Sequence, residues 1–235
     1  SMENLERKNR CIDIVFCIDG TGSMSDCIEN VKKHARNFYS MLVEKMTRLG
    51  SDIDETRVQV IVFRDYGYDG ANAMQISPFF LLDQDAADYE EFLANVRAQG
   101  GGDGPENGLE ALYYAMQSAF ESGDDDRQVI VLFTDADALD LGARADKENY
   151  PKDMVDEAGL DKMWIGKDQT HVGYLNQLTK RLVIFAPAGT KYEALAKRWN
   201  LTWYKAVADD NGLSEISFED IIDLIGKSAT AKARR

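Results

Sequence analysis

Short apolar runs alternate along this chain with segments of helical periodicity. The runs occupy residues 12–18, 58–63, 129–133 and 182–185, and they are rich in Val, Ile and Phe. Each run is mostly apolar on both of its faces, which is the pattern of a strand that is covered on both sides. Such strands, alternating with helices, indicate a mostly parallel sheet.

The segments between the runs supply the helices that would cover this sheet. Apolar side chains recur every three or four residues between Ile28 and Met46, the helical period, and Gly50 ends that segment. The same analysis predicts further helices at residues 86–98, 107–120, 192–199 and 218–226. Residues 74–82 are expected to form an edge strand antiparallel to the second strand, and residues 201–204 a short final strand. The expected fold is therefore α/β, doubly wound, with helices on both faces of the sheet.

The alternation of strands and helices continues without an internal repeat or a low-complexity linker, which predicts a single domain. We expect an N-terminal arm at residues 1–10, a single domain at 11–228 and a C-terminal tail at 229–235. Residues 136–175 show no clear periodicity and form a long irregular insertion. Because this insertion leaves the end of the third buried strand, we expect it to lie over or beside the ligand-binding face and to shape a partner surface.

Charge and cysteine usage narrow the classes of partner. The chain has 41 Asp and Glu against 27 Lys and Arg, a net charge of -14, which repels nucleic acid and anionic lipid surfaces and attracts cations and basic proteins. No apolar run approaches the roughly 18 residues that cross a bilayer. Cys11, Cys17 and Cys27 form no CxxC pair, and this odd number of cysteines predicts reduced thiols in the cytoplasm. The oligomeric state is left open.

Oxygen-rich loops follow or precede the buried strands. Asp19, Thr21 and Ser23 follow the first strand, Asp103 precedes a helix, and Asp135 ends the third strand. Ligands of open α/β sheets bind beyond the carboxyl ends of the strands, so these loops are expected to converge. Carboxylates and hydroxyls without His or Cys select a hard cation: Mg²⁺, or Mn²⁺ or Ca²⁺ in its place.

A simpler interpretation assigns the same residues to helix capping, because Asp, Ser and Thr are favoured at helix N-termini. Asp103 with Glu106 would then form a variant of the capping box. Arg64 and Asp65, at the end of the second strand, are interpreted as a structural ion pair. Asp137 and Asp140 are expected to be solvated rather than to bind a metal.

The motifs DGTGSM after a strand, FRDY after the second strand, GGGDGPE before a helix and TDAD after the third strand occur in this order. This arrangement resembles the von Willebrand factor A domain and its metal ion-dependent adhesion site, most closely in the bacterial and α-kinase-associated branch. The resemblance covers residues 12 to about 135.

The resemblance implies a role for each residue of the predicted site. Thr21 and Ser23 would offer hydroxyls directly to the metal, while Asp19 and Asp135 would act on it through water. Asp103 stands where the family commonly has Thr. A third carboxylate would hold the metal more tightly and would weaken capture of a carboxylate from a partner.

The function expected from the sequence is a metal-dependent protein-interaction module in a bacterial intracellular complex, and not an enzyme. One alternative is a Mg²⁺-dependent hydrolase of phosphatase type, although the chain has neither a Walker-type loop nor a GxSxG motif. The other alternative is a scaffold whose metal site is unused.

Overall fold

The computed structural model describes residues 9–101, 104–168, 170–171, 174–208 and 216–233. One sheet runs through this part of the chain. Its strands are β1 (Cys11–Asp19), β2 (Glu55–Phe63), β3 (Met74–Ile76), β4 (Phe80–Leu81), β5 (Arg127–Phe133), β6 (Lys180–Pro187) and β7 (Thr202–Val207). Its helices are α1 (Ser25–His34), α2 (Phe38–Arg48), α3 (Ala86–Ala94), α4 (Gly108–Met116), α5 (Glu157–Trp164), α6 (Lys191–Arg198) and α7 (Phe218–Thr230).

The sheet confirms the predicted fold class. Its order is β3-β2-β1-β5-β6-β7, and β4 also pairs with β2. The strands β2, β1, β5, β6 and β7 run parallel, while β3 and β4 are antiparallel to β2. The predicted antiparallel edge is thus present as two short strands with a break at Ser77 and Pro78, where proline has no amide hydrogen to donate to the sheet.

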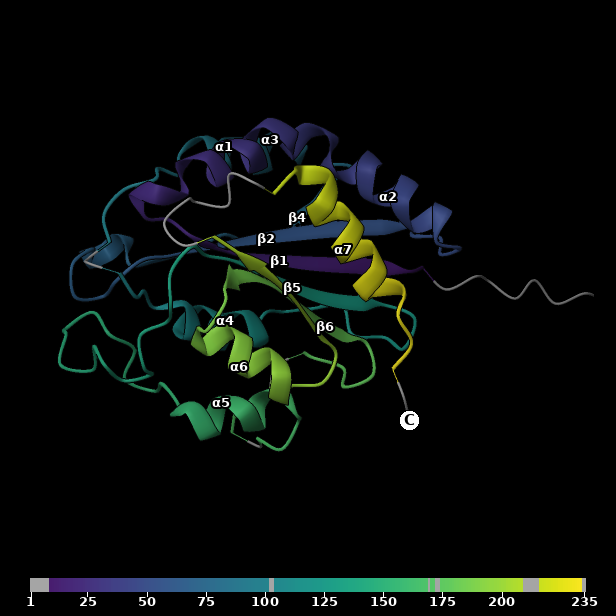
Figure 1. Ribbon diagram of the computed structural model, residues 1–235. Helices are drawn as coiled ribbons and strands as arrows, with labels where there is room; N and C mark the ends of the chain where they lie inside the picture. The colour runs from purple at the N-terminus through teal and green to yellow at the C-terminus, as the bar shows by residue number, and fades with distance from the viewer. Residues whose placement is uncertain (1–8, 102–103, 169, 172–173, 209–215, 234–235) are drawn as a thin grey trace, which may run out of the picture.

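Helices cover both faces of the sheet (Figure 1). Alternate residues of each strand point to opposite faces, so Phe16 packs in one core and Val15 and Cys17 pack in the other. The first core lies under α1, α2, α3 and α7. The second core lies against α4, α5 and α6. Every strand that is buried on both faces therefore contributes apolar side chains to two cores, which explains the continuous apolar runs.

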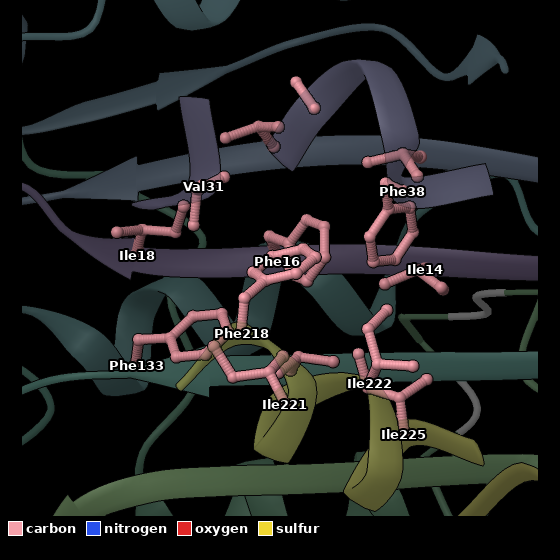
Figure 2. Packing of buried hydrophobic residues seen from close by; sticks show 14 of the residues in the cluster. Ile14, Phe16, Ile18, Val31, Phe38, Phe133, Phe218, Ile221, Ile222 and Ile225 are labelled. Atoms are coloured by element: carbon pink, nitrogen blue, oxygen red, sulfur yellow. The ribbon is translucent and has the colours of Figure 1, made fainter. Parts of the chain in front are cut away.

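The first core is aromatic at its centre, as Figure 2 shows. The rings of Phe16 and Phe38 meet edge to face with centroids 5.4 Å apart, and Phe133 lies 5.9 Å from Phe16 on the other side. Ile221 and Ile225 of α7 pack against the same face. Contacts between β1, β5, α2 and α7 thereby join segments that are far apart in the sequence.

Two helical predictions differ from the structure. The amphipathic segment after β1 is interrupted by a 3-10 turn at Ala35–Asn37, so it forms α1 and α2 rather than one helix. The insertion at 136–175 was expected to be irregular throughout, and this is wrong because it contains α5. None of the helices in the described part of the chain has the length and apolar character that crossing a lipid bilayer requires.

Candidate metal centre

The strands β1 and β5 are neighbours in the sheet, and the chain segments that follow them go to opposite faces of the sheet. β1 leads into α1 on one face of the sheet, whereas β5 leads toward α5 on the other face. The loops that leave two such strands separate, and this switch point is the usual ligand position in doubly wound sheets. Asp19 ends β1 and Asp135 follows β5, so both lie at this switch point.

Asp19 connects the two strand ends through hydrogen bonds to hydroxyls. It is the last residue of β1, and its side chain is fully buried. The Thr21 hydroxyl donates to Asp19 Oδ1 over 2.6 Å, and the Thr21 amide donates to the same oxygen over 2.9 Å. The Thr134 hydroxyl, directly after β5, donates to Asp19 Oδ2 over 2.8 Å. Both oxygens of this carboxylate are therefore held in place by uncharged donors.

Burial dominates the electrostatics of Asp19. It raises the pKa of this carboxyl from 3.8 to about 6, because the charged form loses its hydration. The hydrogen bonds from Thr21 and Thr134 act in the opposite direction, and the charge of Asp135 raises the pKa further. A bound cation would offset the like charges of Asp19 and Asp135 at this point.

The other predicted site residues have different positions. Asp135 is buried at 2% exposure, one residue after Thr134. Ser23 is exposed in the 3-10 turn Gly22–Met24 that follows Thr21. Asp103 lies outside the described residues. Within the part of the chain that the structure describes, no group of three or more His, Cys, Asp or Glu is arranged to hold a metal ion; the predicted ligands there include two hydroxyls, those of Thr21 and Ser23.

The loop before α4 packs tightly against the loop after β1. Gly101 has φ +83°, and a Cβ atom at this residue would lie 2.5 Å from Thr21 Cγ2 and 2.8 Å from Glu106 Oε1. Both the backbone conformation and the space require glycine here. The side chains of Thr21 and Glu106 both lie close to the position that a side chain at Gly101 would occupy.

Sequence reasoning missed the contacts of Thr134 and Glu106 near Asp19 and Thr21. Glu106 is not the third residue of a capping box, since α4 begins at Gly108 with Asn107 as its N-cap. Its backbone pairs with the segment after β5 instead, donating to Asp137 O and accepting from Leu139 N. Its carboxyl group is 2% exposed, and burial, followed by the charges of the surrounding acids, raises its pKa to about 9.

Arg64 and Asp65 do not form the ion pair expected from the sequence. Asp65 pairs with Arg144, whose Nε and Nη2 donate over 2.7 and 2.8 Å. The buried Arg64 guanidinium donates to the carbonyl oxygens of two loops at the site and to its own loop. Its acceptors are the carbonyls of Gly20, Gln99, Arg97 and Asn72 and the amide oxygen of Gln75. Arg64 therefore fixes the spacing between the loop after β1 and the chain entering the loop before α4.

The first part of the insertion lies at the same end of the sheet. Ala138 bridges to Glu106, Arg144 reaches Asp65, and Tyr150 meets the ring of Tyr66 at 5.2 Å. Asp137 accepts from the amide of Lys191 at the start of α6. Asp140 forms an ion pair with the Lys191 ammonium and remains solvated as expected, because its side chain is 71% exposed.

These features define a doubly wound domain with a cluster of acids and hydroxyls at its switch point. The model of the von Willebrand factor type A domain matches residues 13–183. The chain therefore belongs to the von Willebrand factor type A domain family.

Comparison with individual proteins agrees with this assignment. The chain is 30% identical over 101 residues to the alpha-protein kinase vwkA of Dictyostelium discoideum, a match that covers 43% of this chain and 15% of the kinase. Two structures of the pilus adhesin SpaC from Lactobacillus rhamnosus GG align over 95% of the chain with TM-scores of 0.54 and 0.55, at 14% and 15% identity. The chain spans 31% and 30% of those adhesin chains, and at this identity the likeness concerns the fold.

Proposed function

We propose that this domain binds a divalent cation between the carboxyl ends of β1 and β5 and that the loaded domain binds a partner protein. Mg²⁺ is the expected ion, with Mn²⁺ and Ca²⁺ as alternatives. Domains of this family commonly mediate protein–protein interaction and often carry such an ion. When bound, the ion supplies positive charge beside Asp19 and Asp135 and positions for water or for an oxygen of the partner.

The observation that carries this proposal is the bond from the Thr21 hydroxyl to Asp19. A hydroxyl has one proton and two lone pairs, so a threonine that donates to a buried carboxylate keeps its lone pairs for a cation. Asp19 orients Thr21 in this way, and its negative charge would act on the ion without direct contact. The arrangement fits a hard cation, which prefers oxygen ligands.

The proposal assigns a binding role and no catalytic role to the domain. Hydrolysis would require a general base at the switch point between β1 and β5. Both histidines have other surroundings, since His34 stacks on Phe218 with centroids 4.4 Å apart and His171 lies 3.1 Å from Asp168. We expect no Mg²⁺-dependent hydrolysis of p-nitrophenyl phosphate; turnover that is lost in Asp19→Asn would identify a hydrolase instead.

A bacterial intracellular setting, in the cytoplasm, remains part of the proposal. It is supported by the three cysteines, which are free and buried, as expected of a chain kept reduced. Burial raises the pKa of the Cys27 thiol to about 12, so this group stays protonated at neutral pH and is a packing residue.

Metal-linked stability tests the proposal. Protein stripped with a chelator and dialysed should gain melting temperature on addition of Mg²⁺ or Mn²⁺, because a ligand of the native state stabilises by about 2.7 kcal/mol at a hundredfold excess over Kd. The double variant Thr21→Ala, Ser23→Ala should lose this gain. Proteins captured by the Mg²⁺-loaded domain and lost with that variant would be candidate partners.

Ser25→Ala is the matched control, because Ser25 is an exposed hydroxyl on the same turn and is not a predicted ligand. It should retain the full metal-dependent gain. Absence of any gain in the stripped wild-type protein would favour a scaffold with an unused site. An equal gain in the double variant would show that the ligands were assigned wrongly.

A further inference from the structure

Glu106 is a buried carboxylate with an oxygen that lacks a hydrogen-bond partner. The residue is 2% exposed, and Oε2 is among the few buried side-chain atoms of the described residues without such a partner. Burying a carboxylate without compensation costs several kcal/mol in general, so native proteins pair these groups with donors or with cations. A cation beside Glu106 would stabilise the charged form of its carboxyl group, which burial otherwise disfavours.

The side chain of Glu106 lies near the loop after β1. A Cβ atom at Gly101 would be 2.8 Å from Glu106 Oε1 and 2.5 Å from Thr21 Cγ2, so this oxygen is close to the methyl group of Thr21. The backbone of Glu106 is held by Asp137 and Leu139, on the segment that follows Asp135. Glu106, in the loop before α4, thus lies close to both the loop after β1 and the segment after β5.

Acids dominate the charges that act on Glu106. Burial disfavours its ionised form most, and the charges of Asp19, Asp65, Asp69 and Asp135 add to this effect. The Arg64 guanidinium also interacts with Glu106, although its hydrogen bonds go to carbonyl and amide oxygens. Among the described residues, the hydrogen-bond donors to Asp19 are the neutral groups of Thr21 and Thr134. A cation at this point would take the place of the proton that burial and these acids keep on Glu106.

We propose that Glu106 is the contribution of the loop before α4 to the cation site, where its carboxylate compensates the ion beside Thr21 or binds water of the ion's shell. This inference rests on the proposed function and adds a residue outside the set Asp19, Thr21, Ser23, Asp103 and Asp135. Mg²⁺ keeps several of its waters in protein sites, so a carboxylate that is not close enough for direct contact still binds the hydrated ion.

Glu110 provides a matched control within the same chain. It lies about one helical turn after Glu106, is fully buried, and has one oxygen, Oε1, without a partner, while Oε2 accepts from Asn107. The acids that act on it are Asp65 and Glu157 rather than Asp19 or Asp135. Glu110 is therefore buried like Glu106, but it does not share the position of Glu106 near Asp19 and Asp135.

The experiment compares Glu106→Gln and Glu110→Gln in the full chain, stripped of metal and titrated with Mn²⁺ and Mg²⁺ by calorimetry and by thermal unfolding. Both variants should melt at or above the wild-type temperature without metal, because each removes a buried ionisable group and keeps its shape. With metal, Glu110→Gln should keep the wild-type Kd and stabilisation. Glu106→Gln should bind at least tenfold more weakly and should lose most of the stabilisation.

The outcomes separate this inference from the proposed function. If the wild-type protein does not respond to either ion, the proposed function fails and the inference fails with it. If the wild-type protein responds and Glu106→Gln binds as tightly as Glu110→Gln, only the inference is overturned. If Glu106→Gln does not fold, Glu106→Asp replaces it: the carboxylate retracts by one methylene, and a Kd equal to wild type would contradict the assignment.

Discussion

Glu110 gives the molecule a pH dependence that can be measured without metal. Burial raises its pKa from 4.5 to about 8, the bond from Asn107 opposes this shift, and the charges of Asp65 and Glu157 add to it. A folded-state pKa above the unfolded value means that the native protein holds this proton longer than the unfolded chain does. The contribution of Glu110 to stability is therefore complete below pH 4.5 and is lost as pH rises through about 8.

We predict that the free energy of unfolding of the metal-free protein falls between pH 5 and pH 8.5, and that Glu110→Gln makes this decline shallower. One such group contributes a slope of up to about 1.4 kcal/mol per pH unit. Urea unfolding at several pH values in the presence of a chelator measures both curves. Parallel curves for the two proteins would show that Glu110 is not protonated in the native state at neutral pH.

At the residue scale, the sequence predicted that Asp19 and Thr21 lie together but not the contacts that Thr134 and Glu106 make near them. Asp19 and Thr21 are close in sequence and follow a strand, so their proximity in space is local. Thr134 meets Asp19 across two neighbouring strands, and the burial of Glu106 depends on the path of residues 137–139. Neither contact has a local signal, because acids near a helix start are as common in caps as in sites.

At the element scale, predictability followed the length and periodicity of each segment. The buried strands were evident because their side chains are apolar on both faces, and the cores on those two faces explain why. Helix α5 was missed because it is short and contains Gly159, a residue that weakens helices. Its signals were Asp156, which accepts from the amide of Gly159 as an N-cap, and the spacing of Leu160, Met163 and Trp164.

One of the contacts between the first part of the insertion and the loop after β2 is the ion pair of Arg144 with Asp65. Arg144 donates twice to Asp65, and the Asp65 side chain is 2% exposed while that of Arg144 is 26% exposed. Without Arg144, the Asp65 carboxylate would remain buried with the Gly67 amide as its remaining donor to Oδ1 among the described residues. Losing one partner of a buried pair costs more than losing both.

We predict that Arg144→Met destabilises the protein by about 2–3 kcal/mol and that Asp65→Asn in the same chain restores part of the loss. Urea unfolding of both single variants and the double variant measures the coupling between the two side chains. Hydrogen exchange should accelerate mainly in the segment around residues 138–150, which the ion pair attaches to the loop after β2. Strictly additive effects of the two substitutions would indicate that the pair contributes no coupling.

At the scale of the whole molecule, the stable unit extends beyond the match to the family model. That match ends at Val183, inside β6. Helix α7 then covers the first core with Phe218, Ile221, Ile222 and Ile225 (Figure 2). The same helix accepts hydrogen bonds from the sheet, since the guanidinium of Arg181 donates to Ser228 O over 2.9 Å. Helix α7 therefore covers the apolar side chains on this face of β1, β5 and β6.

We predict that a chain ending at Val207, which keeps α6 and β7 and removes α7, does not fold cooperatively, although it contains every predicted metal ligand and the complete family match. Removing α7 exposes an apolar face that includes Phe16 and Phe133, and large unprotected apolar faces lead to aggregation. A chain ending at Lys232 keeps α7 and the bond from Arg181 to Ala231 O, and should unfold in a single transition like the full chain. Near-ultraviolet circular dichroism and urea unfolding compare the two, and cooperative unfolding of the chain ending at Val207 would show that the first core is stable without its closing helix.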